Sequence, residues 1–225
     1  HMIEAHRDRK LSSINAFDIV TKIANSVVVG GVRRSSIITL SDLHDNGMRD
    51  AKQGQFWMTN AHRAMSNNSA IYDSKPNSIE FMKEWLALAE SGTGERGIFN
   101  RKSAKSKVQE NGRRKVDYAF GCNPCNEIIL RPYQFCNLTE VVCREADHLD
   151  ILKEKVRIAT ILGTFQSTLT DFKYLRRVWR DNTEEERLLG VSLTGILDCY
   201  LLNNGTKESI PVSYTHLTLP TNREV

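Results

Sequence analysis

The sequence predicts a layered α/β protein, and two neighbouring segments carry that prediction. Residues 12–28 place apolar side chains at three- and four-residue steps, the period of an amphipathic helix, and Gly30 and Gly31 then end it. The run 36–40 is rich in β-branched residues and bounded by polar ones, as in a short buried strand. A helix that feeds a strand through glycines is typical of packed helix and sheet layers.

The first helix has a clear start, and a second helix follows after a polar stretch. Ser12 or Ser13 can cap the first helix. Residues 47–69 are rich in Asn, Gln, Ser and Arg without a clear period, so we expect mostly loop. Asn77 followed by Glu80 has the form of a capping box, which predicts a helix up to Gly92. Its buried stripe is expected to comprise Phe81, Trp85 and Leu88.

The second half of the chain predicts one long helix between less regular segments. Residues 101–115 are basic and polar, and we expect a solvated connection there. Residues 150–169 have helical periodicity. The inward face of this helix is expected to comprise Leu152, Val156, Ala159, Leu162, Phe165 and Leu169. Thr183 to Glu186 has the form of a capping box before a last apolar segment that ends at Leu202.

Length, composition and charge exclude several classes of protein. The 225 residues are 40% hydrophobic and 26% charged, which fits one large folded domain or a piece of one. The sequence contains no apolar run of about 18 residues and residues 1–7 do not resemble a signal peptide, so we expect a cytoplasmic protein without a membrane span. The net charge of +4 suits a phosphorylated small molecule and is too low for a nucleic-acid groove.

The C-terminal tail differs from the rest of the sequence. Residues 211–225 follow neither the helical nor the strand period and resemble a translated sequencing adapter, so we leave them out of the fold. The predicted folded region is therefore 1–210. His1-Met2 is compatible with a native start and with a cloning remnant.

Five cysteines favour metal binding or thiol chemistry over a disulfide framework, because their number is odd and the chain is long. They are Cys122, Cys125, Cys136, Cys143 and Cys199. Cys122 and Cys125 have the C-x-x-C spacing of half a zinc site, but the sequence has no second C-x-x-C or histidine pair to complete it. A redox dithiol requires its C-x-x-C at a helix start, whereas Pro124 precedes the strand-like residues 128–130.

A third interpretation takes Asn123, Cys125 and Glu127 together. These residues alternate, so on an extended loop their side chains would present an amide, a thiol and a carboxylate to one small ligand. The plain alternative is a polar loop beside a core strand, in which the cysteines act as small hydrophobic side chains.

Two motifs around these cysteines are specific. The Asn-Pro-Cys-x-Glu motif at 123–127 and the Cys-Asn-Leu-x-Glu-Val motif at 136–141 resemble the active-site finger loop of ribonucleotide reductases, specifically of the adenosylcobalamin-dependent class. Four further segments are similar to that family in the same order, namely 27–35, 66–69, 91–100 and 189–196. The resemblance covers most of the chain and implies a partial ten-stranded α/β barrel with the finger loop at its centre.

The resemblance also implies a role for each catalytic residue. Cys125 corresponds to the cysteine that becomes a thiyl radical and abstracts the 3′ hydrogen of the ribonucleotide. Glu127 corresponds to the base for the 3′-hydroxyl proton, and Asn123 to the amide that orients the ribose hydroxyls. Cys136 corresponds to one of two reducing cysteines that form a disulfide as the 2′-hydroxyl leaves as water.

The resemblance places further residues near the substrate and implies a fragment. Gly30, Gly31, Asn67, Asn68 and Ser69 correspond to regions near the substrate base. The family's other reducing cysteine lies upstream of the Gly-Gly-Val-Arg-Arg segment, where this sequence has none, and the family's phosphate loop and C-terminal cysteine pair lie beyond the start of the tail. We therefore expect a central fragment that is inactive alone.

The resemblance also leads to an expected strand pairing and an expected proximity of two cysteines. We expect the strand-like residues 128–130 and 138–142 to pair around the turn 131–133, which would bring Cys125 and Cys136 close together. The remaining cysteines, Cys122, Cys143 and Cys199, match no family role and are taken as structural.

The implied enzyme reduces ribonucleotides to deoxyribonucleotides. Its expected cofactor is adenosylcobalamin, with no protein-bound metal. Its expected partners are the ribonucleotide, dNTP or ATP effectors and a thioredoxin-like reductant, without nucleic acid or membrane. The alternatives are the large subunit of a metal-radical (class I) reductase and a zinc-knuckle binding module built on Cys122 and Cys125.

Overall fold

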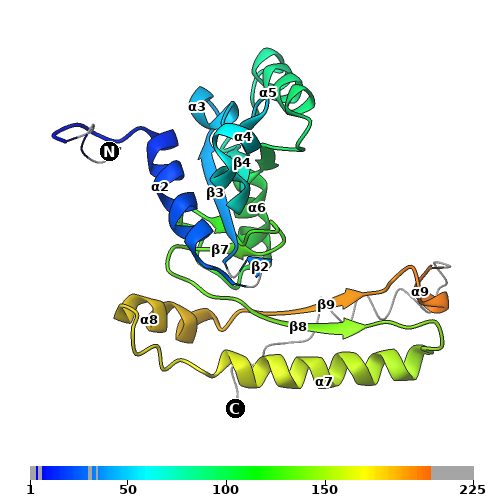
Figure 1. Ribbon diagram of the computed structural model, residues 1–225. Coiled ribbons are helices and arrows are strands. Elements are labelled where there is room, and N and C mark those ends of the chain that lie inside the picture. Colours follow the sequence, from blue (N-terminus) through cyan, green and yellow to red (C-terminus); the bar gives the residue numbers. More distant parts are fainter. Residues whose placement is uncertain (1–3, 5–6, 30–31, 34, 204–225) are drawn as a thin grey trace. The chain divides into compact units, whose positions relative to one another are not determined.

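The computed structural model in Figure 1 describes residues 4, 7–29, 32–33 and 35–203. The chain divides into two compact units, residues 1–132 and residues 133–225. Each unit combines helices with parallel strands, so the predicted α/β class is confirmed. The largest sheet within the described residues has three strands, and these residues do not close a ten-stranded barrel.

The first unit is built on a parallel sheet. Its strands are β3 (Ile37–Asp42), β4 (Ser66–Ile71) and β5 (Gly97–Phe99), with β4 in the middle. The expected strand at 36–40 is thus confirmed, whereas the prediction of mostly loop at 47–69 is wrong in part. That stretch contains α3 (Asn46–Arg49), α4 (Phe56–Thr59), a 3₁₀ helix (Ala61–Met65) and the start of β4. The asparagines at the start of β4 have low strand propensity, and pairing with β3 overrides it.

The two helices predicted from caps are confirmed at their starts. Helix α2 (Ser13–Ser26) begins after Ser12, whose hydroxyl accepts the backbone N–H of Asn15 at 3.3 Å. Helix α5 (Ser78–Ser91) begins with the Asn77–Glu80 capping box. Their predicted buried faces are partly wrong. Ile23, one of the apolar residues on the expected inner face of residues 12–28, is 63% exposed, and Trp85 is 54% exposed. The smaller residues Thr21 and Ala87 are buried instead.

The rest of the first unit contains another helix and two short antiparallel pairs. Helix α6 (Arg101–Asn111) occupies a stretch expected to be a plain connection, and Asn100 caps it. Strand β1 (Val28–Val29) pairs with β2 (Val32–Arg33), and β6 (Gly121–Cys122) pairs with β7 (Ile129–Leu130). The second of these pairs carries the candidate site in its connecting turn.

The second unit is a parallel strand pair with helix α7 packed against it. Strand β8 (Asn137–Val142) lies beside β9 (Leu189–Thr194), and α7 (Leu149–Ser167) and α8 (Arg177–Glu186) connect them (Figure 1). A short helix, α9 (Tyr200–Asn203), follows. The core lies between the strands and α7 and contains Val141, Cys143, Leu152, Val156, Ala159, Val191 and Cys199. A Cβ on Gly163 would lie 2.1 Å from a terminal methyl carbon of Leu189, so a larger residue at this position of α7 would have to displace the Leu189 side chain.

Three predictions for this half of the chain need correction. Strand β7 pairs with β6, and β8 pairs with β9, so the expected pairing of 128–130 with 138–142 is wrong. Thr183 lies in the last turn of α8, where its hydroxyl donates to the carbonyl of Trp179, so the supposed capping box starts no helix. The long helix was correctly predicted, but only its first half is buried as expected, since Phe165 is 68% exposed.

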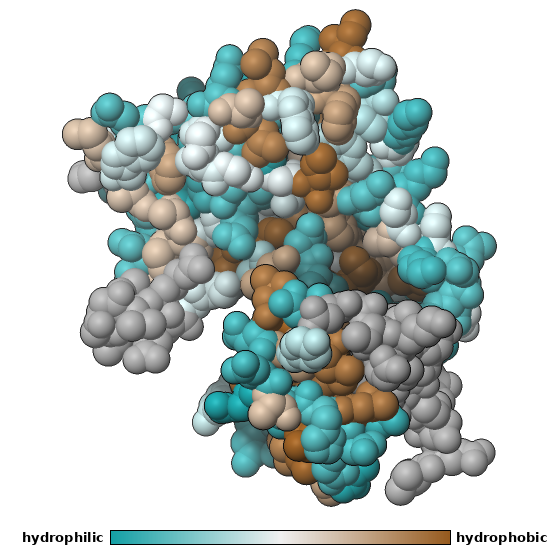
Figure 2. All heavy atoms as spheres, turned by 90° about the vertical axis from the view of Figure 1, so that its right-hand side faces the viewer, coloured by the Kyte–Doolittle hydropathy of each residue, from teal (hydrophilic) through white to brown (hydrophobic). Residues whose placement is uncertain are grey.

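Large apolar side chains also lie on the surface of both units. Figure 2 shows apolar patches, in brown, among the hydrophilic surface of the two units. The exposed apolar residues include Met58, Ile79 and Met82 in the first unit and Leu162, Phe165 and Leu169 in the second. Within the described residues, no helix is both long and apolar enough to cross a membrane.

Candidate active site

The segment 123–127 forms a tight turn between β6 and β7. The backbone N–H of Asn126 donates to the carbonyl of Asn123 at 2.9 Å, which closes a four-residue turn with Pro124 and Cys125 at its centre. Asn126 then adopts a positive φ of 71°, which asparagine tolerates better than most residues. The extended loop assumed from the alternation of side chains is therefore wrong. Proline at the second turn position was a signal for this geometry.

Two of the predicted site residues meet across this turn. The side-chain amide of Asn123 donates to the carboxylate of Glu127 at 2.5 Å. The amide oxygen of Asn123 accepts the backbone N–H of Ile128 at 2.9 Å, and the backbone N–H of Asn123 donates to the carbonyl of Ile128. Asn123 thus ties both ends of the turn together and holds Glu127 at the same time.

The two cysteines of the hairpin differ in environment. Cys125 is exposed at the tip of the turn, and Cys122 is half-buried in β6. Burial, reinforced by the nearby negative charge of Glu127, raises the pKa of Cys122 to about 11. Cys122 therefore stays a neutral thiol near neutral pH, which is unsuited to a nucleophilic dithiol.

A zinc site on this hairpin lacks ligands in the described part of the chain. Within residues 4, 7–29, 32–33 and 35–203, no group of three or more His, Cys, Asp or Glu side chains is placed to hold a metal ion. Cys122 and Cys125 are therefore not joined there by the further ligands that a structural zinc ion requires.

The chain matches no family model, but it is similar to curated proteins over almost its whole length. It is 31% identical over 210 residues to the adenosylcobalamin-dependent ribonucleoside-triphosphate reductase of Lacticaseibacillus paracasei, which covers 92% of this chain and 27% of that protein. It is 32% identical over 208 residues to the reductase of the same name from Lactobacillus acidophilus, covering 91% and 27%. The chain is a homologue of one segment of adenosylcobalamin-dependent ribonucleotide reductases. It spans about a quarter of the length of these relatives.

The first unit also contains β4, on which three predicted substrate-binding residues lie. The side-chain amide of Asn67 donates to the carbonyl of Pro124 at 2.7 Å and so reaches the turn that carries Cys125. Asn68 and Ser69 are only 3% and 6% exposed within this unit. Their substrate-binding role stays a prediction, and the contact of Asn67 with the turn was not foreseen from the sequence.

The other predicted site residues lie elsewhere. Gly30 and Gly31 fall outside the described residues. Cys136 lies in the second unit, directly before β8, and is half-buried. Its predicted proximity to Cys125 and its reducing role stay predictions.

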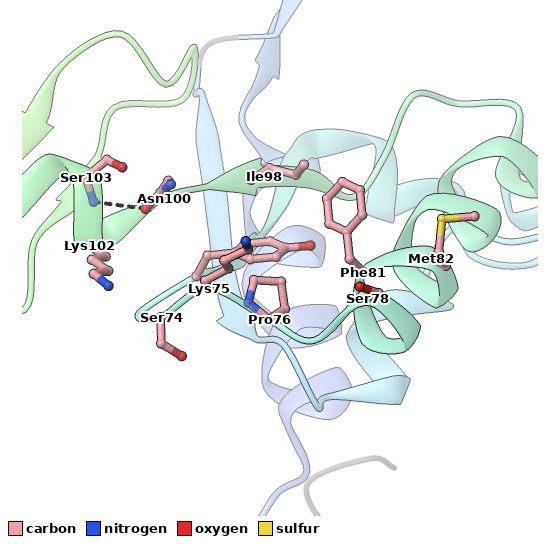
Figure 3. A pocket seen from close by; sticks show the side chains of 11 residues that line it. Ser74, Lys75, Pro76, Ser78, Phe81, Met82, Ile98, Asn100, Lys102 and Ser103 are labelled. Atoms are coloured by element: carbon pink, nitrogen blue, oxygen red, sulfur yellow. Dashed lines mark hydrogen bonds between the residues drawn. The ribbon is translucent and has the colours of Figure 1, made fainter.

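A cavity in the first unit lies apart from these residues. It has a volume of about 660 Å³ and lies between the start of α5, the end of β5 and the start of α6. Figure 3 shows the side chains that line it. Tyr72, Phe81 and Ile98 supply apolar surface, and Lys75 and Lys102 also line the cavity. None of the predicted site residues lines it.

Proposed function

We propose that this chain is a central segment of an adenosylcobalamin-dependent ribonucleotide reductase and that Cys125 carries the thiyl radical. The observation that carries the proposal is the hydrogen bond between Asn123 and Glu127 across the turn with exposed Cys125 at its tip. It lies in a chain whose relatives are named for this activity. Because those names specify triphosphates, we take a ribonucleoside triphosphate as the substrate.

Adenosylcobalamin, when bound, supplies a carbon-centred radical. The thiol of Cys125 is the feature of the turn that suits this chemistry. The thiol of Cys125 is exposed and forms no disulfide, so a radical source outside this segment can reach it. A cysteine suits this role because its S–H bond is comparable in strength to the C–H bond of the ribose.

The residues of the turn divide the work on the ribose. The Cys125 sulfur takes the 3′ hydrogen, so that an S–H bond forms as the C3′–H bond breaks. Glu127 accepts the proton of the 3′-hydroxyl, and Asn123 keeps Glu127 within reach of it. The 2′-hydroxyl then leaves as water, and Cys125 finally returns the hydrogen atom to C3′.

The electrons for the reduction come from a pair of cysteines. Cys136 and a second cysteine outside this sequence each give one electron and one proton as they form a disulfide. A thioredoxin-like protein then reduces that disulfide, and dNTP or ATP effectors act on the complete enzyme. The proposal places the enzyme in the cytoplasm, where protein thiols stay reduced.

The proposal extends to the fold of the complete protein. The parallel strands β3, β4 and β5 of the first unit, and β8 and β9 of the second, would belong to a ten-stranded α/β barrel. The apolar side chains exposed on both units suit a segment that packs against further protein. The names of the relatives favour this class over a class I large subunit, which uses a metal-radical partner.

The test uses a full-length reductase that carries this segment. Cys125→Ser should abolish deoxynucleotide formation, because an alcohol O–H bond is too strong for the radical transfer. Cys122→Ser changes the other cysteine of the same hairpin in the same way and should retain turnover. Wild-type deoxynucleotide yield from Cys125→Ser would refute the proposed function.

A further inference from the structure

The turn that carries Cys125 is held to the sheet by a side chain from β4. The Nδ2 amide of Asn67 donates to the carbonyl oxygen of Pro124 at 2.7 Å. Pro124 directly precedes Cys125, so this bond fixes the peptide group next to the reactive residue. Fifty-seven positions separate the two residues in sequence, and the contact therefore depends on the fold.

Asn67 is itself attached to a rigid part of the first unit. It lies on β4, the middle strand of the parallel sheet, opposite Ile38 of β3. The preceding residue, Ser66, is fully buried, and its hydroxyl lies 2.9 Å from that of Thr39. The ammonium group of Lys52 donates to the carbonyl of Ser66 and pairs with Glu95 at 2.5 Å. Both the side chain and the backbone carbonyl of Ser66 therefore anchor the start of β4.

The hairpin that carries the turn has little strand structure of its own. Strands β6 and β7 have two residues each, and a two-stranded hairpin is only marginally stable without further packing. Cys125 and Asn126 are exposed. The side chain of Asn126 also contacts the carbonyl of Ile98 on β5, but at 3.4 Å this contact is long for a hydrogen bond. The contact from Asn67 is the shorter of these two connections to the sheet.

We infer that Asn67 is a positioning residue that fixes the height and direction of the Cys125 turn relative to the sheet. This inference rests on the proposed function, because Cys125 must approach one hydrogen of the ribose. It gives Asn67 a role toward the protein backbone in place of the substrate contact expected from the sequence. Misplacement of a reacting group by about 1 Å can cost about 100-fold in rate.

The first test measures the turn directly, by amide hydrogen exchange in the 225-residue chain. Asn67→Asp retains the shape of the side chain and removes the donor. We expect the amides of residues 123 and 125–128 to exchange at least about fivefold faster, while those of β3 stay unchanged. Asn77→Ala removes the same residue type from the cap of α5 and should leave the turn unaffected. If Asn67→Asp does not fold, Asn67→Ala removes the donor without adding charge and is judged by the same amides.

The second test measures turnover in the full-length reductase. Asn67→Asp should lower kcat by about 100-fold and change KM by less than about twofold, because chemistry is affected more than binding. Asn77→Ala should retain wild-type kcat. Unchanged exchange at residues 123 and 125–128, or an unchanged kcat, would refute the positioning role. If Cys125→Ser is inactive in the same assay, that refutation leaves the proposed function intact, whereas an active Cys125→Ser removes the proposed function itself.

Discussion

Asn123 and Glu127 are joined by a hydrogen bond of 2.5 Å that crosses the turn carrying Cys125. The same asparagine accepts the backbone N–H of Ile128 with its side-chain oxygen. One amide therefore stabilises the turn and holds the carboxylate. This arrangement predicts that the chemistry of Glu127 and the shape of the turn depend on each other.

The effect of the Glu127 charge on the pKa of Cys122 should be measurable. Burial and that charge disfavour the thiolate and raise the pKa of Cys122 to about 11. The rate of Cys122 alkylation by iodoacetamide should therefore keep rising with pH to about pH 10, without a plateau. Glu127→Gln removes the charge and should lower the apparent pKa. Glu110→Gln, an exposed carboxylate of the same unit, should leave it unchanged. A plateau near pH 8.5 in the wild type would contradict the assigned environment.

A buried ion pair should contribute strongly to the stability of the first unit. Asp18 on α2 accepts two hydrogen bonds from Arg63, at 2.7 and 2.9 Å, and lies 3.0 Å from a ring nitrogen of His62. Asp18→Asn leaves the Arg63 charge buried without its partner and should cost about 3–5 kcal/mol in urea unfolding. The exposed Glu110→Gln serves as the control and should change the midpoint little.

The contribution of this pair should depend on pH. Burial alone would raise the pKa of Asp18, but the hydrogen bonds and charges of Arg63 and His62 outweigh it and hold the pKa below its usual value. Because its pKa is lower in the folded state, Asp18 stabilises the folded protein at pH values above its unfolded pKa of about 4. This stabilisation is lost as the pH falls below that value. The difference in unfolding free energy between wild type and Asp18→Asn should therefore shrink below about pH 4. A difference that stays constant down to pH 2.5 would contradict this.

The 225-residue chain alone should not turn over ribonucleotides. It aligns with only about a quarter of the length of its relatives. The proposed reaction also needs a second reducing cysteine besides Cys136. We expect no deoxynucleotide from the chain with adenosylcobalamin and a dithiol, against a full-length reductase as the positive control. Turnover by the chain itself would mean that the electrons follow another route.

Loss of Cys136 should block reduction while leaving radical formation intact. In the full-length protein, Cys136→Ser cannot form the disulfide that accompanies loss of the 2′-hydroxyl. Deoxynucleotide yield should fall to the background of the assay, whereas Cys122→Ser should retain it. A Cys136→Ser enzyme with normal yield would move the reducing role to another residue.

Local sequence signals predicted the helix starts well. Ser12 before α2 and the Asn77–Glu80 pair before α5 act through contacts within one turn, so the sequence contains the whole cause. The same pattern at Thr183 was misleading, because α8 already begins at Arg177. A capping motif shows that a hydrogen-bonding pattern is possible, and the surrounding chain decides whether a helix begins there.

Strand pairing and burial were harder to predict, because they depend on residues far apart in the sequence. The start of β4 is rich in Ser and Asn and becomes a strand through its pairing with β3, and β5 joins β4 only from Ser69 onward. The candidate site likewise combines a local sequence signal with a contact between distant residues. The family motif located the segment that contains Asn123, Cys125 and Glu127, but the contact between Asn67 and Pro124 appears only in the fold.

The most direct test of the account is hydrogen exchange between solvent and the 5′ carbon of adenosylcobalamin in the full-length reductase. The S–H hydrogen of a cysteine exchanges with water, so reversible hydrogen transfer through Cys125 would carry solvent deuterium to that carbon. We predict incorporation in the wild type and in Cys136→Ser, and none in Cys125→Ser. Incorporation by Cys125→Ser at the wild-type rate would contradict the assignment of the thiyl radical to Cys125.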